Sequence, residues 1–286
     1  MYPTTFNKSY LFKVLLAFAA VFFMNKASYA QVDTLVANNQ KIACSVKEIT
    51  PDAVKYTLPG EDLINSVYKN TVQQIIFKNG RVQTFAESTS YKSVTGVMDF
   101  DNVTITSVES EVKGLFKITD VGAKAKGTTV YANQERVKDR AYHKLKLQAA
   151  MFGANIIYLS NQRTEGNKYG SEYTSGSTTE TNLTGIAYSN VLPDFEKFKK
   201  LIGSKTDCVA ILKFKLGPSF SDVSSDAMNE PFKIASIRSE NGLVFVDGDL
   251  KGEDYTITFQ LVNFTDKSFT VAYKNKGTAY SFVINI

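Results

Sequence analysis

The sequence feature that most constrains the fold is a helix-like segment that ends on glycine and runs straight into an apolar stretch. Between residues 136 and 159, apolar residues recur at spacings of four and three, and Gly153-Ala154-Asn155 then leads into Ile156-Ile157-Tyr158-Leu159. The apolar stripe consists of Val137, Ala141, Leu145, Ala149 and Phe152. A stripe of this kind buries one face of a helix, and glycine suits a helix end because the left-handed conformation carries no Cβ penalty. We therefore expect a helix packed on a sheet, with a strand following at Asn155.

The polar positions of the same segment predict a solvent-exposed helix face. They include Arg140, Lys144, Lys146 and His143, which is the only histidine in the chain. A catalytic imidazole needs a partner that orients it, and the neighbours of His143 are cationic. We therefore expect His143 to lie in solvent without a catalytic role.

The segment before the helix has the period-two pattern of strands. Residues 33–85 alternate apolar and polar positions in four or five short runs, and Asn79-Gly80 is a strong hairpin signal. We expect a small β module over residues 31–86, either a curled sheet or a barrel. Residues 86–102 are polar and without period, as in a linker, and a strand is expected over 112–118, followed by turns over 120–128.

The C-terminal part has the clearest β pattern. A short amphipathic helix is expected over residues 195–202, ending at Gly203, and a strand over 208–216. After a serine-rich stretch, five alternating runs follow, with Asn241-Gly242 as a second hairpin turn. They predict an antiparallel meander that either closes into a small barrel or packs on the earlier sheets.

These patterns predict an α+β, strand-rich fold with three parts after a leader. The leader is residues 1–30, followed by the small β module over 31–86. A helix-on-sheet domain over 103–203 contains a polar loop at 164–185, and the antiparallel β domain covers 204–286.

The leader has the three regions of a signal peptide. Lys8 and Lys13 precede the apolar run 14–24, and Ala27-Ser28-Tyr29-Ala30 offers small residues for cleavage before Gln31. An uncleaved anchor is the alternative, although the run is shorter than the roughly 18 residues of a membrane span. We expect an exported protein that is periplasmic, outer-membrane-associated or extracellular, with no transmembrane span in the mature chain.

The charge balance argues against a nucleic-acid partner. The chain has 33 basic and 28 acidic residues, and removal of residues 1–30 takes away three lysines, which leaves 30 − 28 = +2. Phosphate binding needs a concentrated basic face. Cys44 and Cys208 are compatible with one disulfide in an exported protein, or with two separate buried thiols.

Two parts of the chain resemble known families. Ala141, Leu145, Ala149 and Gly153-Ala154-Asn155 match a helix ending shared by the YbjQ-like and RcsF-like small α/β domains, and the match spans about 114–188. RcsF-like proteins carry a lipid anchor and paired cysteines that this region lacks, and the ligands for a YbjQ-like metal site are also missing. The N-terminal run resembles a β module of exported Bacteroidetes-type proteins. The first resemblance implies an α/β fold and the second an envelope origin.

No catalytic, cofactor or metal motif emerges from the sequence. There is no second histidine, nucleophile elbow or phosphate loop. The carboxylates Asp247, Asp249 and Glu253 could serve glycoside hydrolysis or calcium binding, but their spacing is that of a polar turn. We therefore expect no enzyme, no cofactor and no metal.

Two functions remain from the sequence alone. The first is a non-enzymatic envelope protein of binding, structural or stress-sensing type that contacts an envelope protein partner, with Tyr169 and Tyr173 as aromatic contacts on the polar loop. The second is a small-molecule or lipid carrier whose C-terminal domain forms a cup for a small apolar ligand. The residues expected to line that cup are Phe259, Phe269, Tyr273 and Phe282.

Overall fold

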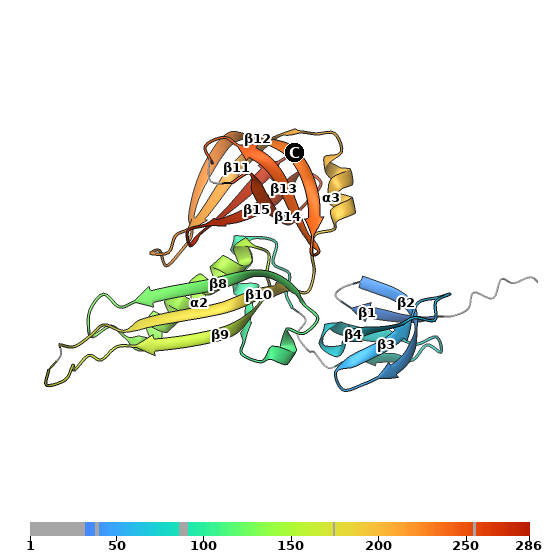
Figure 1. Cartoon of the computed structure of the whole chain (residues 1–286), viewed down its shortest axis with the longest axis horizontal. Coiled ribbons are helices and arrows are strands. Elements are labelled where there is room, and N and C mark those ends of the chain that lie inside the picture. The colour runs from blue at the N-terminus through green and yellow to red at the C-terminus, as the bar shows by residue number, and fades with distance from the viewer. Residues whose placement is uncertain (1–31, 38–39, 86–90, 174, 254–255) are drawn as a thin grey trace, which may run out of the picture.

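The computed structural model describes residues 32–37, 40–85, 91–173, 175–253 and 256–286, so the expected signal peptide lies outside the described residues. The strands form three sheets, which we call the N-terminal sheet, the middle sheet and the barrel (Figure 1). The predicted strand-rich α+β class is confirmed. Among the helices that the structure describes, none is long and apolar enough to cross a membrane.

The N-terminal sheet is antiparallel throughout, with strand order β4-β3-β2-β1-β5-β6. Its strands are β1 (Asp33–Ala37), β2 (Gln40–Ile49), β3 (Ala53–Thr57), β4 (Ile64–Tyr68), β5 (Val72–Ile76) and β6 (Val82–Thr84). Leu35, Val54 and Ile75 are fully buried in its core. The Asn79-Gly80 turn joins β5 to β6 as expected, and Gly80 has a φ of +82°. The Asp33 carboxylate accepts main-chain hydrogen bonds from Val46 and Lys78, each at 2.8 Å.

The segment after the N-terminal sheet differs from the expected linker. Residues 86–90 lie outside the described part, but Val94, Val97 and Val103 are buried in the same cluster as the long helix. The 3₁₀ helix η2 (Val97–Asn102) packs against that helix. Too few apolar residues occur here to produce a period, so only tertiary packing reveals their burial. The strand expected over 112–118 starts at Phe116 instead, because Gly114, with a φ of +80°, forms a turn before it.

The middle sheet carries the long helix that the sequence predicts. Its strand order is β7-β9-β10-β8, with β7 parallel to β9 and the other neighbours antiparallel. The strands are β7 (Thr104–Thr106), β8 (Phe116–Lys126), β9 (Ile156–Glu165) and β10 (Glu180–Ser189). The turns expected over 120–128 are therefore mostly strand. Helix α2 (Gln134–Met151) is capped by the Asn133 side chain, and Gly153 has a φ of +74° just beyond its end.

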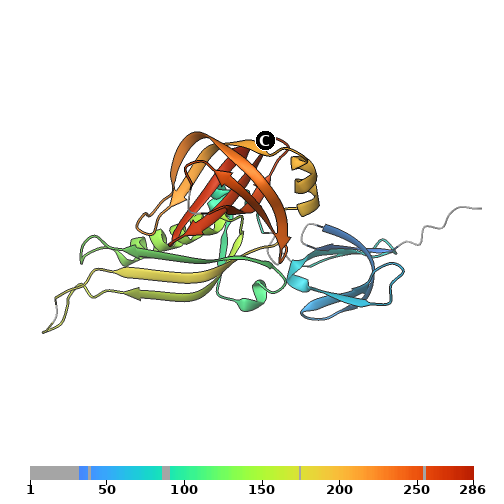
Figure 2. The ribbon, with the colours of Figure 1, turned by 45° about the horizontal axis from the view of Figure 1, so that its top comes forward.

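Helix α2 lies between the middle sheet and the barrel (Figure 2). The expected stripe is buried, but Leu147, Ala150 and Met151 are buried too. The expected solvent-exposed face is wrong at Lys144, whose ammonium donates a hydrogen bond to the main-chain oxygen of Pro218. Burial lowers the pKa of Lys144. The barrel covers this side of the helix, which no local pattern indicates.

The barrel is closed and antiparallel, formed by six strands that follow one another in order. The strands are β11 (Asp207–Leu216), β12 (Ser224–Glu240), β13 (Leu243–Leu250), β14 (Thr258–Phe264), β15 (Ser268–Asn275) and β16 (Thr278–Asn285). Of the two expected alternatives, the C-terminal strands close into a barrel, and its outer face packs on helix α2. Closure depends on β11, which pairs with both β12 and β16.

A bulge in β11 decides which of its side chains enter the barrel. The register shifts between Ala210 and Leu212 on both sides of the strand. Cys208 and Ala210 belong to the interior cluster, whereas Phe214 and Leu216 belong to the cluster around α2. A shift of one residue exchanges the two faces of a strand. The bulge therefore turns apolar residues outward against the helix and Lys213 inward.

The two ends of the barrel are closed by different groups. At one end, Phe198 of helix α3 (Phe195–Ile202) contacts the ring of Phe269, with ring centroids 5.4 Å apart. At the other end, the Glu253 carboxylate pairs with Lys213 and accepts a hydrogen bond from Tyr273. The side chain of Glu253 is 4% exposed and that of Lys213 is 23% exposed.

The two cysteines are free and buried in separate clusters, Cys44 in the N-terminal sheet and Cys208 in the barrel. Burial raises the pKa of both thiols. Of the two alternatives from the sequence, the structure has separate buried thiols.

Candidate functional site

The two tyrosines expected as partner contacts lie in the loop that joins β9 to β10. Tyr169 is 83% and Tyr173 is 88% exposed. This hairpin extends away from the barrel and from the N-terminal sheet (Figure 1). A protein partner at these two rings stays a prediction.

The four rings expected to line an apolar cup instead fill the barrel. Phe259, Phe269, Tyr273 and Phe282 are at most 6% exposed. Phe259 contacts the rings of Tyr273 and Phe282 at centroid distances of 5.6 and 6.2 Å. The structure therefore differs from the expectation of a preformed cup between these rings, because Phe259, Tyr273 and Phe282 pack on one another. The ring of Phe269 packs on Phe198 and Phe232. Inward-facing aromatic side chains produce the same period-two pattern whether they pack together or surround a ligand.

The candidate carboxylates are not gathered in one cleft. Asp247 is hydrogen-bonded to Ser236, Arg238 and Thr258 on the neighbouring strands. Glu253 is held inside the barrel end, and Asp249 is exposed on β13. Among the described residues, no three His, Cys, Asp or Glu side chains are grouped so that they could hold a metal.

His143 has two neighbours that the sequence did not indicate. Its ring meets the edge of Phe100 at a centroid distance of 4.8 Å, and its Nε2 lies 3.6 Å from an Asp222 carboxylate oxygen. Its side chain is 36% exposed, so the expected solvent contact is only partial.

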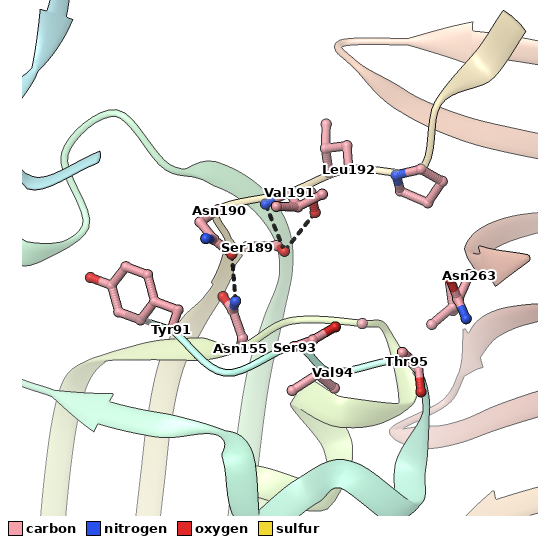
Figure 3. A pocket seen from close by; sticks show the side chains of 13 residues that line it. Tyr91, Ser93, Val94, Thr95, Asn155, Ser189, Asn190, Val191, Leu192 and Asn263 are labelled. Atoms are coloured by element: carbon pink, nitrogen blue, oxygen red, sulfur yellow. Dashed lines mark hydrogen bonds between the residues drawn. The ribbon is translucent and has the colours of Figure 1, made fainter. Parts of the chain in front are cut away.

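A pocket lies where the middle sheet meets the barrel, and we call it the junction pocket (Figure 3). It has a volume of about 200 Å³. Its lining comes from four separate segments of the chain, which the linear sequence keeps far apart. These are Tyr91 and residues 93–95 before η2, Gly153 and Asn155 after α2, residues 189–193 between β10 and α3, and Val262 and Asn263 of β14.

The helix ending highlighted by the sequence forms one wall of this pocket. Gly153 lies so close to the barrel that a Cβ there would be 3.0 Å from a Val262 methyl carbon and 3.3 Å from its main-chain oxygen. Val262 is at a register shift of β14, where the pairing with β15 jumps between Leu261 and Asn263. The glycine therefore both ends the helix and lets the barrel approach it.

Asn155 is held rigidly at the base of the pocket. Its main-chain nitrogen donates to Tyr188 at 3.0 Å, and its main-chain oxygen accepts from Thr104 at 3.0 Å. Its side-chain nitrogen donates to Oδ1 of Asn190 at 2.6 Å and lies 3.4 Å from the Lys92 oxygen (Figure 3). Nearby, the Ser189 hydroxyl donates to the Val191 oxygen at 2.7 Å.

One polar atom of this arrangement is left over. Asn155 is 3% exposed, and its side-chain oxygen has no hydrogen-bond partner within the part of the chain that the structure describes. Leaving a buried acceptor unpaired costs about 1–3 kcal/mol. An unpaired buried group in a native protein therefore calls for a partner such as a water or a ligand.

The pocket is electrically neutral. Its lining contains amides, hydroxyls, one phenol and aliphatic side chains, and among the residues that the structure describes none that lines it is Asp, Glu, Lys, Arg, His or Cys. Such groups hydrogen-bond to a neutral ligand but supply no general acid or base of ordinary reactivity at neutral pH. The arrangement suits recognition.

Sequence reasoning singled out Asn155 only as part of a helix ending. A signal was present, because Asn155 is a polar residue at the entrance of an apolar strand, where burial is expected. Asn190 and Asn263 carried no comparable signal, since they follow or interrupt strands at ordinary polar positions.

Comparison with known proteins returned no match to a family model, a curated protein or a solved structure. The resemblance of residues 114–188 to YbjQ-like and RcsF-like domains therefore stays a prediction, as does that of the N-terminal sheet.

Proposed function

We propose that this chain is an exported, non-enzymatic binding protein of the cell envelope, and that the junction pocket holds a small, uncharged polar ligand. The observation that carries the proposal is the buried, unpaired side-chain oxygen of Asn155 in a pocket lined by neutral hydrogen-bonding groups. A ligand that donates one hydrogen bond to this oxygen removes the penalty of an unpaired buried acceptor.

Binding fits the chemistry better than catalysis. The carboxylates Asp247 and Glu253 are each engaged by hydrogen bonds within the barrel, away from the junction pocket. Among the described residues of the pocket lining, no hydroxyl has a histidine or carboxylate beside it that could act as its base, which also favours a non-enzymatic role. Export is supported by the leader pattern over residues 1–30.

The position of the pocket supports a sensing role. Its walls belong both to the middle sheet and to the barrel, so a ligand that contacts Asn155 and Asn263 bridges the two. Because a ligand that binds only the folded state stabilises it, occupancy strengthens the joint between sheet and barrel. The exposed Tyr169 and Tyr173 remain the proposed contact for an envelope protein partner.

The test has two arms. Fractionation of the cells that natively produce the chain, with an antibody against it, should recover it, shortened at the N-terminus, in the envelope or the medium; recovery at full length in the cytoplasm would contradict export. Thermal unfolding with a library of neutral polar compounds should raise the melting temperature of the wild type. The Asn190→Leu variant, which lacks the amide beside Asn155, should lose that increase.

The matched control for the ligand arm is Asn161→Ala, because Asn161 is an exposed asparagine of β9 outside the pocket. It should keep the ligand response of the wild type. If charged or fully apolar compounds stabilise the chain and neutral polar ones do not, the proposed pocket chemistry is wrong.

A further inference from the structure

We infer that the ligand of the junction pocket is the ring of an uncharged sugar, an inference that rests on the proposed function. The geometry points to this class through the two amides at the base of the pocket. The side-chain oxygen of Asn155 is unpaired. The side-chain oxygen of Asn190 accepts from Asn155, so its side-chain nitrogen can donate to an acceptor on a ligand. One acceptor and one donor thus lie side by side.

A pair of neighbouring hydroxyls on a sugar ring matches this arrangement. Each hydroxyl both donates and accepts, so one can donate to Oδ1 of Asn155 while the next accepts from Nδ2 of Asn190. Figure 3 shows the two amides facing each other, with the Tyr91 ring on one side of them. The Tyr91 hydroxyl is engaged with the Glu111 main-chain oxygen at 2.9 Å, which holds that side chain in place.

The remaining walls alternate polar and apolar groups, as a sugar ring does. Ser93, on the segment before η2, and Asn263, on the barrel, make no side-chain hydrogen bond to another described residue and offer further polar contacts. The apolar part of the lining consists of Val94, Leu192, Pro193 and Val262. A pyranose has hydroxyls around its edge and C–H groups on its faces, so both kinds of wall are used. A pocket of about 200 Å³ accommodates a single ring.

Other small-ligand classes fit less well. Within the described part of the chain, no cation lines the pocket to pair with a phosphate, sulfate or carboxylate, and no carboxylate lines it to pair with an amine. An apolar ligand would leave the Asn155 oxygen unpaired, and a site built to hydrogen-bond a hydroxyl discriminates strongly against an analogue that lacks it.

The experiment is a titration of the ¹⁵N-labelled full chain followed by the side-chain amide resonances of Asn155, Asn190 and Asn263. The probes are glucose, galactose and mannose, with glucose 6-phosphate and glucuronate as charged counterparts and acetamide as a neutral ligand that is not a sugar. At least one neutral hexose should shift these resonances in a saturable way, and its charged counterpart should bind at least tenfold more weakly. Short oligosaccharides that end in the same hexose distinguish a free sugar from the end of a polysaccharide.

Variants keep the result decisive. Asn263 lines the pocket from the barrel, apart from the Asn155–Asn190 pair (Figure 3), so Asn263→Ala should weaken hexose binding severalfold without disturbing that pair. Asn190→Leu should abolish hexose binding, and Asn161→Ala should leave it unchanged. Saturable binding of acetamide without any hexose would overturn the sugar inference and leave the neutral binding site standing. No shift with any neutral probe would overturn both proposals.

Discussion

The ion pair that closes one end of the barrel gives the sharpest stability prediction. Lys213 is turned inward by the bulge in β11, and its ammonium pairs with the almost fully buried Glu253 carboxylate. The same ammonium lies over the rings of Tyr280 and Phe282, 5.3 and 5.7 Å from their centroids. The other carboxylate oxygen accepts from Tyr273 at 2.5 Å. The substitution Lys213→Met therefore leaves the Glu253 carboxylate, whose side chain is 4% exposed, without its cationic partner.

We expect Lys213→Met to lower the free energy of unfolding by about 3–5 kcal/mol, because a buried charge without its partner keeps its full desolvation penalty. Glu253→Gln should lower it less, since the Lys213 ammonium is 23% exposed and still reaches water. In the double variant neither charge remains, so its loss should fall short of the sum of the single losses by about 1–3 kcal/mol.

Urea unfolding followed by near-ultraviolet circular dichroism measures these differences, because the chain has 15 tyrosines and no tryptophan. Lys215→Met is the matched control: Lys215 is an exposed lysine of the same strand, and its loss should change stability by no more than about 0.5 kcal/mol. If Lys213→Met is as mild as Lys215→Met, or if the two single losses add fully, the reasoning from burial is refuted.

Three further predictions concern other joints of the structure. Gly153→Ala should lower the free energy of unfolding by about 1–2 kcal/mol from its positive φ alone. It should lower it by more than Gly277→Ala does, because Gly277 has a similar φ but no atom within 4 Å of the new Cβ. Equal losses of stability in urea unfolding would show that the close approach of Val262 adds nothing to the cost. Burial raises the pKa of Asp247, but hydrogen bonds from its neighbours outweigh this effect and hold the pKa below its ordinary value of 3.8. The ionised carboxylate therefore stabilises the fold above that pH, and this stabilisation is lost as the pH falls through the lowered pKa. Acid unfolding of Asp247→Asn should depend less on pH than that of the wild type, and an unchanged acid transition would contradict this. The side-chain nitrogen of Asn70 donates to the main-chain oxygens of Ser110, Glu111 and Lys113 at 2.8–3.2 Å, which ties the N-terminal sheet to the segment before β8. Asn70→Ala should loosen this connection, so limited proteolysis should cut faster between that sheet and η2. Unchanged cleavage would count against this prediction.

Several local elements followed from the sequence because their physical causes are local. Helix α2 depends on an apolar stripe with a period of 3.6 residues, and its end depends on a glycine, a residue without a Cβ. Both features can be read directly from the sequence. The Asn79-Gly80 and Asn241-Gly242 turns depend on residues that tolerate positive φ, and both form.

Contacts between segments that lie far apart in the chain could not be predicted from the sequence. Lys144 looked like a solvent-facing lysine because its helix pattern says nothing about a barrel that begins some sixty residues later. The bulge in β11 is equally invisible, since Leu212 and Lys213 alternate normally in the sequence and only the register with β12 and β16 exchanges their faces.

The sequence by itself therefore determined the class of the fold, the helix and its ending, the hairpin turns and the pattern of a leader. Only the tertiary structure decided that the aromatic strands close on a filled interior and that Asn155, Asn190 and Asn263 meet in one pocket. The physical reason is range: propensity, capping and turn chemistry act within a few residues, whereas closure, register and pocket lining depend on pairings across the chain.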